Sequence, residues 1–475
     1  KNLNRLLEKR VLLEPPNEEL VKGDYSLEKV SYADKKLYDF ALREQDWPRH
    51  VCVTGMSGSG KTTLAFHVVE NFIKREKPFL IFDWKKSFRP LILKSPNMMC
   101  FTIGKENVSN LFKMNINQPP KGISPKEWIN VLCDLLTESF FVSFGVHKVL
   151  LETLDEAFKE WGIYNGSDNY PTWNHIKWRL EEKSNKVKGR EGGWLESALR
   201  IASVLTFGEF GKIVNYDGKK SLSVEDLLDK RAILELNSLS NTEKKFFSEY
   251  ILTYIYKLKK VGQNKVDSEF DHAILVDEAH NIFLNRETSF MSESVTDMIY
   301  REMREYGTSL ICLDQHASKL SDTVTGNSAC HIAFQQQLPE DIRSISSIMQ
   351  LYDQKELFSK LSVGSAIVKL ADRYNQPFLV DVPLIELRKN LFDDERIKSR
   401  MQAIIQGIKV DTEDLEFKKA IVEAREKDIH EEVMIKEEPV NLRGLTFSQE
   451  KILYVIKAKL AEGMSLLQAE QFLED

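Results

Sequence analysis

The sequence predicts an α/β fold in which strands and helices alternate around a mostly parallel sheet. One observation is a short apolar strand that leads through a glycine-rich turn into a segment with helical spacing, over residues 51–69. Another is the recurrence of apolar strands beyond this unit, many of them separated by helical segments. Strands are predicted at 51–54, 78–83, 232–236, 273–278, 309–313, 330–334, 365–369 and 378–382.

The first strand is followed by the phosphate-binding pattern G-x-x-x-x-G-K-[ST] at residues 55–62, Gly-Met-Ser-Gly-Ser-Gly-Lys-Thr. Glycines let backbone N–H groups turn toward a β-phosphate, and the following helix dipole favours an anion. Lys61 is expected to reach the β- and γ-phosphates, and the Thr62 hydroxyl to bind Mg²⁺. A turn without a ligand is the other interpretation, which the strand–turn–helix context disfavours. The residues predicted to bind ATP are Gly55, Ser57, Gly58, Ser59, Gly60, Lys61, Thr62 and Thr63.

The strand at 273–278 ends in two carboxylates, Asp277 and Glu278. Ending a buried strand on two acids is unfavourable unless they face a site. In P-loop enzymes one carboxylate of this strand holds the metal shell, and a neighbouring residue orients the attacking water. Asp277 is therefore predicted to bind Mg²⁺ and Glu278 to act as general base. A solvated strand end is the alternative for either acid alone. For the pair, hydrolysis of ATP is the preferred interpretation.

Composition and charge restrict the class of protein. The net charge is −6, so no overall basic field indicates nucleic acid, although a basic channel inside an acidic exterior is compatible with this value. The five cysteines are scattered without a C-x-x-C pair, which is typical of reduced thiols in a cytoplasmic protein. No apolar stretch reaches membrane-spanning length, and the N-terminal residues show no signal-peptide pattern.

Three regions are predicted along the 475 residues. Residues 1–50 are expected to form a polar, helical N-terminal segment. Residues 51–385 are expected to form the nucleotide-binding core, interrupted by a helical insertion at 115–225. Residues 386–475 are charged and have helical spacing, so a helical C-terminal region is expected.

The order of these motifs resembles the HerA/FtsK superfamily of P-loop motors, and within it the HerA-type ATPases. The resemblance covers about 50–385 and depends on the segments I-L-V-D-E-A-H-N at 274–281, R-E-M-R-E-Y-G-T-S-L-I-C-L-D-Q at 301–315, L-S-D-T-V-T-G-N at 320–327 and L-S-V-G-S-A-I-V at 361–368. It implies a RecA-like P-loop core. Family members usually carry an N-terminal β-barrel, for which the residues before the P-loop are too few and too helical. Such a barrel is therefore expected to be absent or lost by truncation.

The resemblance also implies roles for residues outside the two motifs. Gln315 takes the place of a polar sensor between the Asp-Glu strand and the γ-phosphate. Arg304, three residues before Gly307, takes the place of an arginine that reaches the nucleotide of a neighbouring subunit, with Arg301 as second choice and Arg343 as a weaker third. A solvated strand end and ordinary helix-surface arginines are the corresponding alternatives.

The resemblance further implies a homohexamer that drives double-stranded DNA through its pore, with a partner nuclease or another effector, in DNA processing or antiviral defence. Lys85, Lys86 and Lys319 follow strand ends and are candidates for pore contacts. Two alternatives stay open. One is an ATP-dependent ring scaffold that assembles or gates an effector without translocation, and the other is a secretion or conjugation ATPase close to a membrane. No membrane partner is expected.

Overall fold

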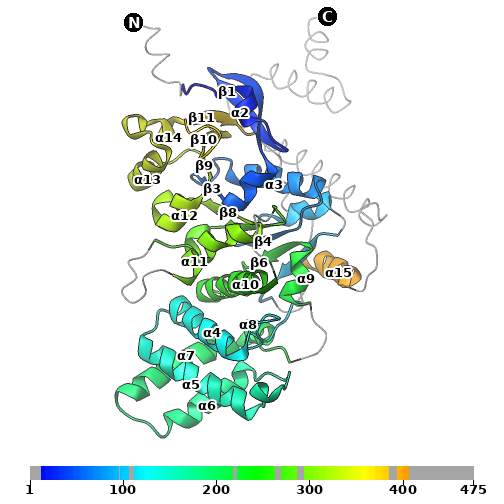
Figure 1. The fold of residues 1–475 in the computed structure, drawn as a ribbon, viewed down its shortest axis with the longest axis vertical. Coiled ribbons are helices and arrows are strands. Elements are labelled where there is room, and N and C mark those ends of the chain that lie inside the picture. The colour runs from blue at the N-terminus through cyan, green and yellow to red at the C-terminus, as the bar shows by residue number, and fades with distance from the viewer. Residues whose placement is uncertain are drawn as a thin grey trace, which may run out of the picture. The chain divides into compact units, whose positions relative to one another are not determined.

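The computed structural model describes residues 12–95, 97–105, 112–217, 222–262, 269–285, 294–383 and 393–405. Within them one sheet has the order β2-β1-β11-β10-β9-β3-β8-β7-β4-β6-β5 (Figure 1). The strands are β1 (Tyr25–Tyr32), β2 (Lys35–Leu42), β3 (Val51–Thr54), β4 (Phe79–Asp83), β5 (Met99–Thr102), β6 (Arg231–Glu235), β7 (His272–Asp277), β8 (Thr308–Asp314), β9 (Cys330–Ala333), β10 (Ser365–Leu370) and β11 (Phe378–Asp381).

Helices lie between most of these strands. They are α2 (Glu18–Val21), α3 (Lys61–Lys74), α4 (Pro125–Ser139), α5 (Phe144–Glu160), α6 (Trp173–Ser184), α7 (Arg190–Thr206), α8 (Gly208–Val214), α9 (Val224–Leu228), α10 (Asn241–Gly262), α11 (Val295–Glu302), α12 (Asp322–Asn327), α13 (Pro339–Met349), α14 (Leu357–Lys360) and α15 (Asp394–Ile405). Among the described helices, none combines the length and apolar character needed to cross a bilayer.

The centre of the sheet is parallel and one end is antiparallel. β3 pairs in parallel with β8 and β9, and the parallel pairing continues through β7, β4, β6 and β5. β9, β10, β11, β1 and β2 follow one another in antiparallel pairs. The parallel strands are buried apolar runs, as expected when helices cover both faces of a sheet. The predicted α/β fold with a mostly parallel sheet is confirmed.

Crossover handedness distributes the helices over the two faces. The step from β3 through α3 to β4 runs along the sheet in one direction, and the steps through α10, α11 and α12 run in the other. Right-handed crossovers therefore place α3 on one face and α10, α11 and α12 on the opposite face. Figure 1 agrees, with α11 and α12 on one side of the strands and α3 on the other. All parallel strands point their carboxyl ends to one edge, where the phosphate loop begins.

The prediction that residues 1–50 are helical is wrong for residues 25–42, which form the hairpin of β1 and β2. The pairing of β1 with β2 contains irregularities between Ser26 and Glu28 and between Lys29 and Ser31. A bulge adds one residue to the period of two. The buried apolar side chains of β1 consequently fall at Tyr25, Leu27 and Val30, a spacing that imitates a helix.

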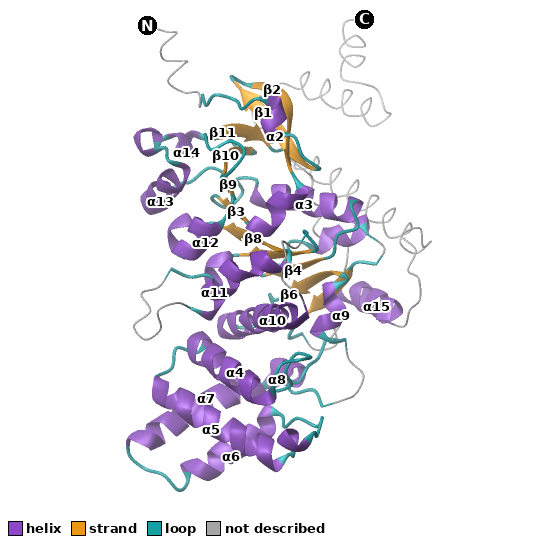
Figure 2. Ribbon diagram, viewed as in Figure 1, coloured by secondary structure: helices purple, strands orange, loops and turns teal. Residues whose placement is uncertain are grey.

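The segment between β5 and β6 contributes the helices α4 to α8, which Figure 2 shows as a purely helical layer beside α10. α4 begins at Pro125 because Ser124 caps it, its side chain accepting a hydrogen bond from the N–H of Glu127 at 3.2 Å. Trp128 on this helix packs edge-on against Tyr250 and Tyr254 of α10. The insertion is thereby attached to a helix that leads directly toward β7. Its predicted boundaries, 115–225, stay a prediction.

Most of the predicted C-terminal helical region at 386–475 lies outside the described residues; α15 is its described part. The Asp394 carboxylate at the start of α15 accepts hydrogen bonds from Lys86 at 3.0 Å and from Lys105. It also pairs with Arg89 at 2.8 Å. These cations hold the pKa of Asp394 well below its usual range, although burial opposes them. The Asp394 carboxylate therefore links α15 to the residues that follow β4 and β5.

Removing this carboxylate with Asp394→Ala is expected to destabilise the fold by about 2 kcal/mol at pH 7, because hydrogen bonds to charged groups are lost. Because the pKa of Asp394 is lower in the folded than in the unfolded protein, the stabilisation is fully present above the unfolded-state pKa. It is lost as the pH falls from there through the folded-state pKa. Thermal or urea unfolding at pH 7 would measure the difference. The neighbouring exposed Glu395→Ala is the control, and an equal effect of both substitutions would contradict this role of Asp394.

Candidate active site

The phosphate loop lies at the carboxyl edge of the parallel strands, between β3 and α3. Gly60 at the N-cap of α3 has φ 123°, and a Cβ there would approach the ring of Phe334 to 2.9 Å. Only glycine fits both the backbone conformation and the space. No side chain caps α3, so the amide groups of its first turn are directed at the loop without an intrahelical partner. This is the arrangement that binds a phosphate group.

Lys61 opens α3, and its ammonium points back over the loop. It donates hydrogen bonds to the carbonyl oxygens of Gly55 and, at 2.9 Å, of Met56. Burial lowers the pKa of Lys61 to about 8, although Glu278 and Asp277 act in the opposite direction. The ammonium thus lies in the loop and close enough to both carboxylates to sense their charge.

Asp277 ends β7, and Glu278 follows it with φ 53° and ψ 49°, a left-handed conformation that is uncommon outside glycine. Burial, together with the neighbouring carboxylates of Asp83 and Glu278, raises the pKa of Asp277 to about 7. A carboxyl group in such a position is stabilised in its charged form by a cation. Backbone strain of this kind collects at functional sites.

Gln315 follows β8, the strand next to β7, and its side-chain amide donates a hydrogen bond to Oε1 of Glu278. Lys85, which follows β4 on the other side of β7, donates to the same oxygen. Burial raises the pKa of Glu278, but these two donors outweigh it and the pKa is lowered. The structure therefore brings Lys61, Asp277, Glu278 and Gln315 to one place, as the sequence predicts. Their chemical roles stay predictions.

Two further carboxylates of this edge did not figure in the sequence prediction. Asp314 at the end of β8 accepts hydrogen bonds from the N–H of His280 at 2.6 Å and from its ring Nδ1 at 2.8 Å. Asp83 at the end of β4 is fully buried and accepts the backbone N–H groups of Ser87 and Phe88. Both acids stand at strand ends like Asp277, and that position is the signal that could have identified them.

Arg301 and Arg304 lie at the opposite edge of the sheet, where β8 begins. Gly307 ends the preceding helical turn in the left-handed conformation, with φ 66°. Arg304 precedes β8 and Asp314 ends it, and the two ends of this seven-residue strand lie about 20 Å apart at the usual rise of a strand. Within the described part of the chain the Arg304 guanidinium is exposed and makes no hydrogen bond or ion pair. Neither arginine contacts the phosphate loop of its own chain.

The residues at the carboxyl edge fit a nucleotide and Mg²⁺. Ser59 in the loop is buried, and its hydroxyl has no hydrogen-bond partner among the described residues. The described residues contain no cluster of three or more His, Cys, Asp or Glu side chains able to hold a metal alone. Mg²⁺ is typically bound by one or two protein ligands together with substrate phosphates. Thr62 and Asp277 would be those ligands here.

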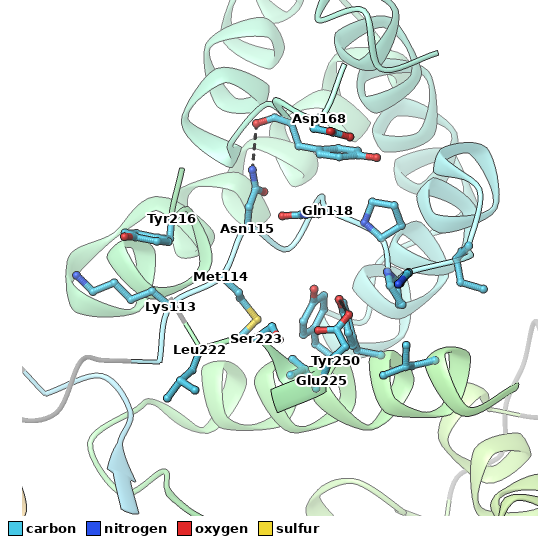
Figure 3. A pocket seen from close by; sticks show the side chains of 18 of the residues that line it. Lys113, Met114, Asn115, Gln118, Asp168, Tyr216, Leu222, Ser223, Glu225 and Tyr250 are labelled. Carbon is cyan, nitrogen blue, oxygen red and sulfur yellow. Dashed lines mark hydrogen bonds between the residues drawn. The ribbon is translucent and has the colours of Figure 1, made fainter. Parts of the chain in front are cut away.

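A large cavity of about 1270 Å³ lies elsewhere, where the helical insertion meets α10. Figure 3 shows Gln118 on one side of it and Glu225 and Tyr250 on the other, while the Lys113 side chain extends toward Tyr216. Its lining is mainly polar and includes none of the predicted site residues. The candidate nucleotide site is therefore formed by the phosphate loop and the strand ends. The cavity in the insertion is separate from it.

Comparison with known proteins agrees with this geometry. Residues 39–255 match the family model described as Helicase HerA, central domain. The DNA double-strand break repair helicase HerA of Sulfolobus acidocaldarius is 22% identical over 336 residues, which cover 69% of this chain and 63% of that protein. This chain thus aligns with less than two thirds of that relative.

Solved structures with a similar fold include VirB4 of Thermoanaerobacter pseudethanolicus, with a TM-score of 0.59, 14% identity and coverage of 79% of this chain and 99% of VirB4. Another is the plasmid coupling protein TrwB in complex with ADP and Mg²⁺, with a TM-score of 0.56, 11% identity and coverage of 74% and 88%. These likenesses concern the fold. The predicted resemblance to HerA-type P-loop ATPases is confirmed by two findings, the match of residues 39–255 to the HerA central domain and the similarity to a curated HerA helicase.

Proposed function

We propose that this chain is an ATP-hydrolysing motor that translocates double-stranded DNA as a homohexamer. The observation that carries the proposal is the convergence of Lys61, Asp277, Glu278 and Gln315 at one sheet edge in a chain whose central domain matches HerA. The HerA relative is a DNA double-strand break repair helicase, which supports DNA as the substrate of this chain as well.

In the proposed reaction the first turn of α3 and Lys61 bind the phosphates of ATP. Thr62 and Asp277 would hold Mg²⁺, which would supply electrostatic stabilisation of the charge on the phosphoryl group. Glu278 accepts a proton from the attacking water, and Gln315 orients that carboxylate. TrwB, which shares the fold, was solved with ADP and Mg²⁺ bound, and this supports the same ligands here.

The position of Arg304 supports a head-to-tail assembly, and the number of six subunits is what the resemblance to HerA-type ATPases implies. An exposed, unpaired arginine at the edge opposite the phosphate loop serves catalysis only at the nucleotide of a neighbouring subunit. Such contacts are head-to-tail, and they close into a ring or continue as a filament. A partner nuclease or other effector, a place in DNA processing or antiviral defence, and the cytoplasmic location expected from the cysteines stay predictions.

Long duplex DNA is expected to raise the ATPase rate at low salt, and the stimulation is expected to fall steeply at moderate salt. Phosphate contacts release counterions, so the log–log slope of binding against salt should be about −0.9 per phosphate neutralised. The measurement is the ATPase rate with and without DNA at both salt concentrations, in protein shown by light scattering to be a hexamer. Rates indifferent to DNA in that hexamer would favour the ring scaffold that assembles or gates an effector.

A further inference from the structure

The contact between Lys85 and Glu278 is not explained by nucleotide binding alone. The Lys85 ammonium donates to Oε1 of Glu278, the same oxygen that accepts from Gln315. The Lys85 side chain is 51% exposed whereas that of Glu278 is only 12% exposed. An anion from solution can therefore reach the ammonium without entering the site of the carboxylate.

Lys85 is held in this place by the loop that follows β4. The buried Asp83 carboxylate accepts the backbone N–H groups of Lys85 at 3.2 Å, Ser87 at 2.9 Å and Phe88 at 2.8 Å. Lys86 has φ 62°, which is in the left-handed region. Lys85 is directed to Glu278, and Lys86 to Asp394 of α15. The loop thus presents two neighbouring cations from one fixed turn.

The contact with Lys85 conflicts with the role proposed for Glu278. A general base needs a carboxylate oxygen free to take a proton from water. Here Oε1 of Glu278 is engaged by two donors, Lys85 and Gln315. Gln315 alone would suffice to orient the carboxylate. The additional bond from Lys85 therefore restrains the carboxylate and occupies an oxygen that would otherwise be open to water.

We propose that Lys85 is a positioning residue that restrains Glu278 until a backbone phosphate of bound duplex DNA takes over its ammonium. This inference rests on the proposed DNA-translocating function and deepens it, since it names a residue through which DNA would control hydrolysis. Lysine binds nucleic-acid phosphates without reading sequence. Exchange of one anionic partner for another keeps the ammonium paired, so the exchange requires little free energy at a half-exposed position.

Replacing Lys85 with alanine in the full chain is expected to raise the ATPase rate without DNA by about two- to fivefold, the factor that corresponds to a half-exposed ion pair. Stimulation by duplex DNA should fall by the same factor. Lys85→Arg, which keeps the charge, should behave like the parent. The matched control is Lys94→Ala, because Lys94 pairs with Glu70 at 3.0 Å with similar exposures of 53% and 20% and lies outside the site.

Other outcomes would overturn the inference. A lower basal rate with a raised KM for ATP would show that Lys85 binds the γ-phosphate of the nucleotide. If the parent responds to DNA and Lys85→Ala keeps the parental basal rate and response, this inference fails and the motor stands. A parent indifferent to DNA would remove the proposed function and this inference together.

Discussion

Replacing Glu278 with glutamine is expected to lower the ATP turnover rate by about 10²–10⁴-fold while ATP binding stays close to that of the parent. Glutamine preserves the shape of the side chain, and its carbonyl oxygen can still accept from Gln315 and Lys85. It cannot accept the proton of the attacking water. The loss should therefore appear in kcat and not in the dissociation constant for ATP.

Steady-state hydrolysis and calorimetric binding of a slowly hydrolysed ATP analogue would measure the two quantities separately. Lys61→Ala is the comparison, because it removes the charge from the phosphate loop and should weaken binding as well as turnover. A Glu278→Gln protein that hydrolyses ATP at the parental rate would show that the base is another group. The pair of Asp314 and His280, joined at 2.8 Å, would then be the first to test.

The convergence of the site could be predicted because parallel strands place their carboxyl ends at one edge. Asp277 follows β7 and Gln315 follows β8, and these strands are neighbours. Strand order alone therefore predicts that the two residues lie close together. The sequence did not determine that Lys85 also reaches Glu278, because that contact depends on β4 pairing with β7 across a gap of almost 190 residues in the chain, from Asp83 to His272.

The N-terminal hairpin could not be predicted from periodicity. Bulges shift the buried side chains of β1 to Tyr25, Leu27 and Val30, so the pattern of burial loses its period of two. β5 was also missed. In both cases the decisive interaction is pairing with a distant strand, Asp381 with Lys29 in one case and Cys100 with Ile233 in the other.

The place of Arg304 before β8 could be predicted because it lies three residues before Gly307 in the sequence. A catalytic role for Arg304, however, depends on a second subunit. The guanidinium lines a cavity of about 520 Å³ together with Arg301, Glu302 and Glu305. This cavity lies at the beginning of β8, and the phosphate loop lies beyond its end. Only a neighbouring subunit that brings its own phosphate loop to this cavity would give Arg304 a catalytic role.

Arg304→Ala is accordingly expected to bind ATP normally and to hydrolyse it about 10³–10⁵-fold more slowly, the range measured for arginine fingers. Arg301→Ala should have a smaller effect. The distinguishing experiment mixes Arg304→Ala with Lys61→Ala, each inactive alone. In a randomly mixed ring about a quarter of the interfaces pair an intact Lys61 with an intact Arg304 from the next subunit, so hydrolysis should partly return. Subunit exchange can be verified by energy transfer between labelled subunits. If hydrolysis does not recover once exchange has been verified, Arg304 does not act across an interface.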